Sequence, residues 1–90
     1  MGTKLSRLFH ADIYTIRIGK KGITEALLKE IDRALDAHGA VKVKMLKNYR
    51  ESRDVDRREV ARLVAERVNA KLVGVRGFTF ILVRERGRKS

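Results

Sequence analysis

The fold is decided by residues 12–46, which read DIYTIRIGKKGITEALLKEIDRALDAHGAVKVKML. Apolar side chains alternate with others in residues 12–18 and again in residues 40–46, the pattern of a half-buried strand. Between these runs, apolar side chains recur every three or four residues from 24 to 38, which predicts an amphipathic helix. A helix that connects two strands of one sheet makes a right-handed crossover, and the two strands are then parallel.

The predicted helix has recognisable ends. Thr24 is a good N-cap, because its hydroxyl can accept a hydrogen bond from an N–H of the first turn. Ile23 and Leu28 stand at the two positions of a hydrophobic staple around that cap. Gly39 follows the last apolar position and is a suitable C-terminal stop.

A loop and a second helix are expected next. Residues 47–53, KNYRESR, are polar and basic, and we predict a loop for them. A helix should run from Asp54 or Asp56 to Val68, with Asn69 as a left-handed stop. The apolar stripe of this helix consists of Val60, Leu63, Val64 and Val68, with Ala61 flanking it.

The chain closes with two predicted strands, residues 71–76 and 78–85, joined by a turn at Gly77. The second run is apolar on both faces, so we expect it in the middle of the sheet. The predicted fold is α/β: a two-layer sandwich with a four-stranded mixed sheet and two main helices on one face, in the order β-α-β-α-β-β. The alternation places Arg17, Lys42 and Lys44 on the face away from the helices, together with Arg76.

Composition excludes several classes of protein. The chain has 90 residues and no cysteine, so it is one domain without a disulfide framework or a thiolate metal site. No run of ~20 apolar residues could span a membrane. The first residues lack a secretory signal, and we expect a cytoplasmic protein. The domain should cover residues 12–86, between a short N-terminal segment, 1–11, and a basic tail, 87–90.

The charge balance suggests the partner. Lys and Arg total 22 against 11 for Asp and Glu, a net charge of +11. Solvated ion pairs explain a high charged fraction but not this excess of one sign. We therefore expect nucleic acid as the partner, with no membrane and no small-molecule substrate. A protein that binds an acidic protein partner and a DNA-binding protein are the alternatives, and a monomer is expected in the absence of RNA.

Residues 19–24, GKKGIT, form the most distinctive local motif. They connect a strand to a helix N-terminus, where unpaired N–H groups and the helix dipole favour an anion. The two glycines permit a close backbone approach, and Lys20 and Lys21 add positive charge. The plain alternative is a solvated strand-to-helix turn. The motif is not a P-loop, because the glycine-lysine-serine/threonine ending of that pattern is absent.

Basic residues form a second candidate surface. Lys42 and Lys44 are two residue rises apart on one face of a strand, and Lys47 and Arg50 continue the run into the following loop. A spacing of ~6.6 Å suits successive phosphates of a nucleic-acid strand. Lysines that protect a sheet edge from pairing are the alternative explanation.

Aromatic and catalytic residues are scarce. Tyr14 and one of the two strand phenylalanines, Phe78 or Phe80, should belong to the core, which leaves Tyr49 as the candidate for base stacking. His10 and His38 show no metal-ligand spacing, and no serine has a base nearby in sequence. We therefore expect no catalytic residues, no metal site and no cofactor.

Several motifs occur together in an order that resembles a known family. They are G-K-K-G at 19–22, I-T-E at 23–25, I-D-R-A-L at 31–35, V-K-V-K at 41–44 and the hairpin V-G-V-R-G-F-T at 73–79. The order and spacing resemble the YhbY-like, or CRM (chloroplast RNA splicing and ribosome maturation), RNA-binding domain over residues 13–86. Two features depart from that pattern. Only LSRLFH precedes the first strand where bacterial members have a full helix, and residues 36–38 lack the tryptophan of plant members.

The resemblance implies a fold similar to the C-terminal domain of the third bacterial initiation factor, without catalysis. It implies binding to ribosomal RNA or to a precursor of the large ribosomal subunit, as in bacterial single-domain members, rather than the intron splicing of plant members. A compact prokaryotic member fits best, with an archaeal source as one option, and a general binder of structured RNA such as tRNA or an intron is the alternative. The expected RNA contacts are Arg17, Gly19, Lys20, Lys21, Gly22, Thr24, Lys42, Lys44, Lys47 and Arg50.

Overall fold

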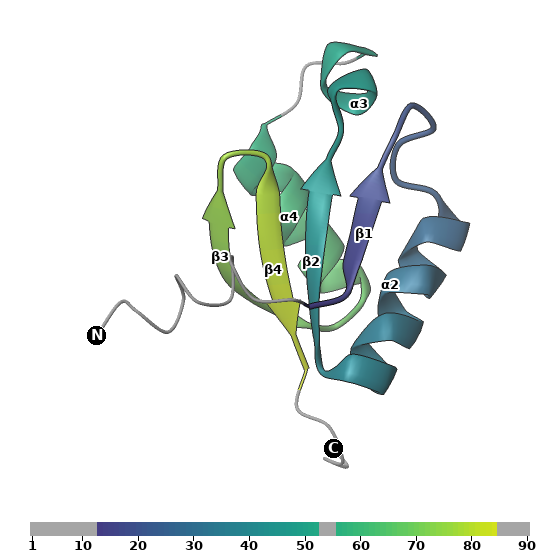
Figure 1. Cartoon of the computed structure of the whole chain (residues 1–90), viewed down its shortest axis with the longest axis vertical. Coiled ribbons are helices and arrows are strands. Elements are labelled where there is room, and N and C mark those ends of the chain that lie inside the picture. The colour runs from purple at the N-terminus through teal and green to yellow at the C-terminus, as the bar shows by residue number, and fades with distance from the viewer. Residues whose placement is uncertain (1–12, 53–55, 85–90) are drawn as a thin grey trace.

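The computed structural model describes residues 13–52 and 56–84 (Figure 1). The segment 1–11 and the tail 87–90 lie outside these residues. The elements follow the predicted order with one additional short helix: β1 (Thr15–Ile18), α2 (Glu25–His38), β2 (Ala40–Met45), α3 (Lys47–Ser52), α4 (Arg57–Arg67), β3 (Lys71–Arg76) and β4 (Thr79–Val83).

Both ends of α2 are closed as predicted. Thr24 has an extended backbone, and its Oγ1 accepts a hydrogen bond from the N–H of Leu27 at 3.1 Å. At the other end, Gly39 adopts a φ of 83° and its N–H donates to the carbonyl of Leu35 at 2.8 Å. Glycine adopts this left-handed conformation at little cost, and the helix therefore stops there.

Helix α4 begins at the Asp56 cap. The Asp56 carboxylate accepts hydrogen bonds from the N–H groups of Arg58 and Glu59 at 3.0 and 3.4 Å. Asn69 has a φ of 54° and is the left-handed stop that the sequence predicts. The prediction for Leu63 is wrong, since its side chain is 43% exposed. The buried stripe is displaced toward smaller residues, which let the helix approach the sheet closely: Ala61, Val64, Ala65 and Val68.

The strand order in the sheet is β1-β2-β4-β3. β1 and β2 are parallel, and the pairs β2–β4 and β4–β3 are antiparallel. β4 therefore lies inside the sheet, as the apolar character of both its faces predicts. Its residues Phe80, Ile81 and Leu82 are completely buried.

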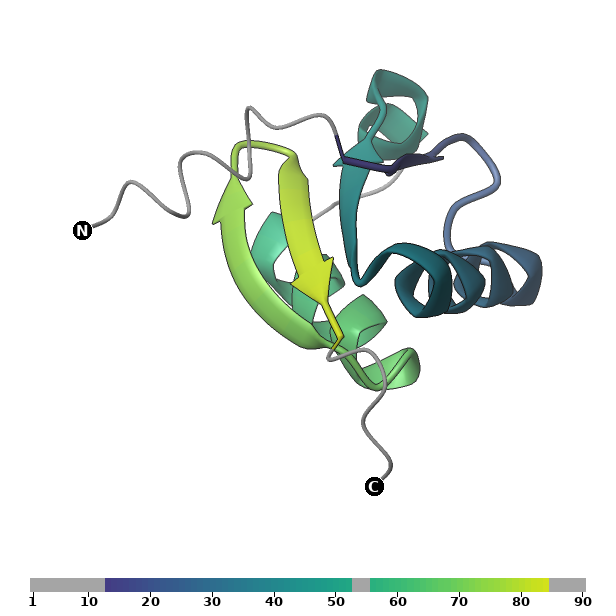
Figure 2. The ribbon, with the colours of Figure 1, turned by 60° about the horizontal axis from the view of Figure 1, so that its bottom comes forward.

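One face of the sheet carries the core. Val41 pairs with Leu82 and Val43 with Phe80, and all four side chains are inaccessible to solvent. In Figure 2, α2 lies below β1 and α4 lies behind β4. Both helices contribute to the single apolar cluster on this face, which confirms the two-layer sandwich: Ile31, Ala34, Leu35, Ala61, Val64, Ala65 and Val68.

The structure reverses the predictions for the two tyrosines. Residues 47–52 form helix α3 rather than a loop, and this helix turns Tyr49 into the core, where it is 4% exposed. Tyr49 therefore has no face to offer a base. Tyr14 is 44% exposed, because β1 begins at Thr15 and Tyr14 precedes it at the rim of the sheet. Phe80 is the strand phenylalanine that fills the core, as expected.

Candidate nucleic-acid interface

The G-K-K-G motif forms a tight turn between β1 and α2. The N–H of Gly22 donates to the carbonyl of Gly19 at 2.9 Å, which closes the turn and places Lys20 and Lys21 at its tip. Both lysines are exposed, and neither forms an ion pair with any residue in the ranges 13–52 and 56–84. Their ammonium groups are available to an anion from solution.

The two glycines of the turn have different structural roles. Gly22 is buried and has a φ of 75°, a left-handed conformation that favours glycine. Gly19 lies outside the left-handed region, and a Cβ built on it would meet no atom within 4 Å. The fold therefore needs a glycine at position 22 and tolerates a side chain at position 19. The open space at Gly19 allows a ligand to approach the backbone.

The turn leads directly into the N-terminus of α2. Thr24 Oγ1 accepts the hydrogen bond that caps the helix, so the residue positions this end of α2, and its hydroxyl hydrogen stays able to donate. The positive end of the helix dipole faces the same side as the turn and favours a phosphate. The carboxylate of Glu25 in the first turn offsets part of this positive potential.

A row of polar and basic side chains crosses the face of the sheet away from the helices, beside the turn. Arg17 pairs with Lys44, Lys44 with Thr79, and Thr79 with Arg76, so the row includes one residue from every strand. Arg17, Lys44 and Arg76 are exposed. Neighbouring strands are ~4.8 Å apart, which brings Arg17 and Lys44 close together. Arg17 is two residues before the turn, so the row and the turn form one continuous surface.

The same face continues away from the turn with the same charge, but it is not open along its whole length, because Ile81, which pairs with Lys42, is completely buried. Lys42 is half-buried beside Thr15, and Lys71 is exposed opposite Val83. None of the four strands contains an acidic residue. We call the set Arg17, Lys20, Lys21, Lys42, Lys44, Lys71 and Arg76 the basic surface.

Lys47 and Arg50 belong to helix α3 rather than to a loop that continues strand β2. Lys47 forms an exposed ion pair with Glu51 at 3.8 Å, one turn along the helix. The guanidinium of Arg50 lies over the ring of Phe78, 4.3 Å from its centroid, and that of Arg57 lies 5.9 Å from the same centroid. The cation–π contact and partial burial commit Arg50 to packing. These two positions are weaker candidates than the sequence suggests.

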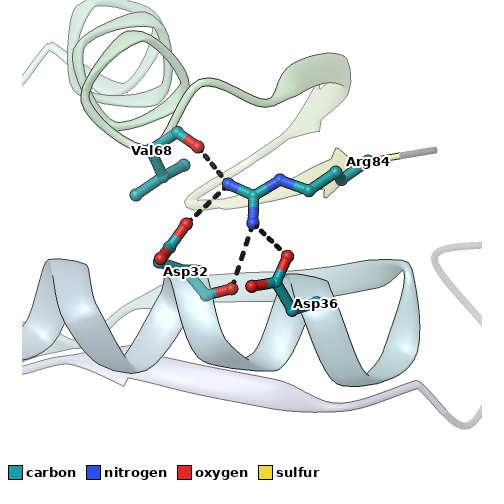
Figure 3. A network of polar contacts seen from close by, with 4 residues as sticks. All are labelled: Asp32, Asp36, Val68 and Arg84. Atoms are coloured by element: carbon teal, nitrogen blue, oxygen red, sulfur yellow. Dashed lines mark hydrogen bonds and ion pairs between the residues drawn. The ribbon is translucent and has the colours of Figure 1, made fainter. Parts of the chain in front are cut away.

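Arg84 is a cation that the fold itself binds (Figure 3). Its Nη2 contacts Asp32 Oδ1 at 2.7 Å and donates to the carbonyl of Val68, and its Nη1 donates to Asp36 Oδ1 at 2.8 Å and to the carbonyl of Asp32 at 3.2 Å. Burial opposes the charge, but the two carboxylates outweigh it and hold the pKa of Arg84 above its ordinary value. Arg84 thus joins α2, the end of α4 and the end of β4.

Sequence reasoning places Arg76 on the face away from the helices but does not name it as an RNA contact, and it misses Lys71. The register of β3 on β4 brings both residues to the basic surface. The sequence signal for Arg76 is the hairpin turn at Gly77, which predicts the face of the sheet toward which the residues beside the turn point. The pairing of β2 with β4, which completes the row, depends on contacts between distant segments.

The described residues were compared with the requirements of a metal site and of a membrane-spanning helix. Between residues 13 and 84, leaving out 53–55, no three His, Asp or Glu side chains are grouped closely enough to hold a metal ion. In the same part of the chain, no helix has the length and apolarity needed to cross a membrane.

Comparison with known proteins places this arrangement in a family. The model of the CRS1 / YhbY (CRM) domain matches residues 2–84. The chain belongs to the CRM family. This confirms the resemblance that the G-K-K-G, I-T-E and V-K-V-K motifs carry.

Two relatives of this CRM domain are informative. The probable RNA-binding protein YqeI of Bacillus subtilis (strain 168) is 32% identical over 69 residues, which cover 77% of this chain and 68% of YqeI. The solution structure of the hypothetical protein SAV1595 from Staphylococcus aureus, described as an RNA-binding candidate, matches with a TM-score of 0.71 and 30% identity. That match covers 98% of this chain and 88% of SAV1595.

Proposed function

We propose that this CRM-family protein is a non-catalytic RNA-binding protein of the cytoplasm, and that its target is ribosomal RNA. It would act in assembly of the large ribosomal subunit or on the ribosome. The observation that carries the proposal is the basic surface, where the lysines of the G-K-K-G turn adjoin a row of cations on strands that contain no acid. The descriptions of YqeI and SAV1595 as RNA-binding support it.

The geometry suits recognition through phosphates. Lys42 and Lys44 are ~6.6 Å apart along β2, comparable with the separation of successive phosphates on a strand. The turn offers exposed ammonium groups, open space at Gly19 and the positive end of α2. Phosphate contacts position a protein on RNA without reading its sequence. The selection of ribosomal RNA would therefore depend on the shape of a folded RNA region.

Crosslinking in the native cells tests the proposal. The RNA attached to the protein is sequenced for the wild type and for a variant that combines Lys20→Asp with Lys21→Asp. We expect strong enrichment of one region of ribosomal RNA, lost in the variant. Diffuse recovery of transfer and messenger RNA, unchanged in the variant, would instead show a general binder and remove the turn from the interface.

A matched control separates the turn from net charge. Arg62 and Arg67 are exposed on α4, which covers the opposite face of the sheet. Arg62→Glu with Arg67→Glu changes the net charge by the same amount as the variant of the turn. We expect this control to keep the ribosomal enrichment. Equal loss in both variants would mean that overall charge, rather than the basic surface, holds the RNA.

A further inference from the structure

A groove runs along helix α2. It has a volume of about 490 Å³ and is lined from the first turn of the helix to its last by Ala26, Lys29, Glu30, Arg33, Ala37 and His38, with Tyr14 at its far end. Ala26 to His38 spans ~18 Å of helix, because each residue rises ~1.5 Å. The lining of the groove begins at Ala26, in the first turn of α2, and its length suits a short stretch of an extended strand.

The far end of the groove carries a stacked aromatic pair. The rings of Tyr14 and His38 are nearly parallel, with centroids 4.9 Å apart and an angle of 15° between their planes. Tyr14 is 44% exposed and His38 is also exposed. A stacked pair at the surface presents an outer aromatic face, onto which a planar base can continue the stack.

The walls of the groove have the charge that a nucleic-acid strand requires. Lys29 and Arg33 are exposed on successive turns of α2, between the G-K-K-G turn and the aromatic pair. Glu30 is the acidic residue of the lining, so the two cations leave an excess of positive charge. Phosphates entering from Lys20 and Lys21 would therefore meet further cations before a base reaches Tyr14.

We infer that this groove is a second binding subsite for single-stranded RNA, in which one unpaired base stacks on the Tyr14–His38 pair. The inference rests on the proposed function and extends it from phosphates to a base. RNA with an unpaired segment next to a structured region would then occupy the basic surface and the groove together. Because any base has an aromatic face, the subsite would select unpaired nucleotides rather than a particular sequence.

The inference is tested by removing the Tyr14 ring and measuring the affinity for two RNA probes. The probes are a short single-stranded RNA and the same strand with abasic nucleotides. We expect Tyr14→Ala to weaken binding of the base-bearing strand about 5- to 150-fold, the usual range for one stacked base, and to leave binding of the abasic strand unchanged. Tyr14→Phe keeps the ring and should bind both strands as the wild type does.

Resonances of the two tyrosines give an independent readout. Tyr14 and Tyr49 are the tyrosines of the chain, and Tyr49 is buried. Fluorine NMR of protein labelled with 3-fluorotyrosine should show a shift of the Tyr14 signal with the base-bearing strand and no shift with the abasic strand. The Tyr49 signal should stay in place in both titrations.

The outcomes distinguish the two proposals. If neither strand binds the wild type, the proposed RNA-binding function is wrong. If both strands bind and Tyr14→Ala changes neither affinity, the groove is not a subsite although the basic surface is. Equal weakening of both strands by Tyr14→Ala, with a lower melting temperature, would show that the aromatic pair only joins β1 to α2.

Discussion

The two ends of α2 hold positive charge in opposite ways. At the N-terminal end, Lys20 and Lys21 extend from a turn without ion pairs in the described part of the chain. Toward the C-terminal end, the Arg84 guanidinium is bound by Asp32, Asp36 and the carbonyl of Val68. The first end is organised to receive an anion from solution, and the second is already neutralised by the protein.

This difference shows that net charge does not locate a binding site. A cation whose donors are satisfied within the fold contributes to stability, whereas one that projects into water contributes to association. Both kinds of cation add equally to the net charge of +11. The position of carboxylates around each cation decides which role it has.

Charge reversal at the turn should have the largest effect. Lys20→Asp with Lys21→Asp removes two phosphate contacts and adds two repulsive charges, so RNA affinity should fall by about 100-fold at moderate salt. Both side chains are exposed, and the free energy of unfolding should change by less than ~1 kcal/mol. Fluorescence anisotropy and thermal melting measure the two quantities. A collapsed melting temperature with unchanged affinity per folded molecule would make the turn purely structural.

Removal of the Arg84 contacts should have the opposite effect, a loss of stability without a loss of RNA affinity. Arg84→Ala removes ion pairs to two carboxylates that are more than half exposed and a hydrogen bond to the Val68 carbonyl, so the free energy of unfolding should fall by about 1–2 kcal/mol. Urea denaturation measures this loss. Arg84→Lys retains the charge but cannot bridge both carboxylates, and should recover only part of the stability.

The RNA affinity of folded Arg84→Ala should equal that of the wild type. A loss of affinity as large as that of the Lys20→Asp/Lys21→Asp variant would contradict the separation of the two ends.

The two glycines of the turn sharpen the comparison within one motif. Gly22→Ala forces a side chain into a left-handed φ of 75° and should lower the free energy of unfolding by about 1–2 kcal/mol. Gly19→Ala should leave stability unchanged or raise it by about 0.5 kcal/mol, because the unfolded chain loses freedom. Its added methyl group should nevertheless weaken RNA binding several-fold. If Gly19→Ala binds RNA as the wild type does, the ligand does not approach the backbone there.

Single cations of the sheet row should have the smallest effects. Lys44→Gln or Arg17→Gln should each reduce the slope of log affinity against log salt by about 0.7, the value for one phosphate contact on a single strand. Arg62→Gln, on the helical side of the molecule, is the control and should leave the slope unchanged. Identical slopes for all three variants would place the phosphates away from the sheet row.

Local features of the chain are predictable because they depend on nearest neighbours. Thr24 and Asp56 cap their helices, and Gly39 and Asn69 end them in left-handed conformations, as the residue types require. The central position of β4 follows from apolar residues on both faces of one run. The facing of Arg17, Lys42 and Lys44 away from the helices follows from strand alternation.

Failures occur where an element ends or meets another. Tyr14 shares the alternation of Ile16 and Ile18, but the periodicity does not show where the cover of the core stops. Tyr49 lies in a segment whose polar residues indicate a loop, and its burial depends on α3 packing against the core. Leu63 has helical spacing, yet the close approach of α4 through Ala61 and Ala65 rotates it outward.

By itself, the sequence determined the four strands, the two main helices and their caps, the excess of positive charge and the motifs of the CRM family, because each depends on spacing within a short segment. Only the tertiary structure decided which charges work together. Arg76 joins Lys44 through strand register, and Arg84 meets Asp32 and Asp36 across 52 and 48 residues of chain. Such contacts arise from packing between distant segments, and no local pattern encodes them.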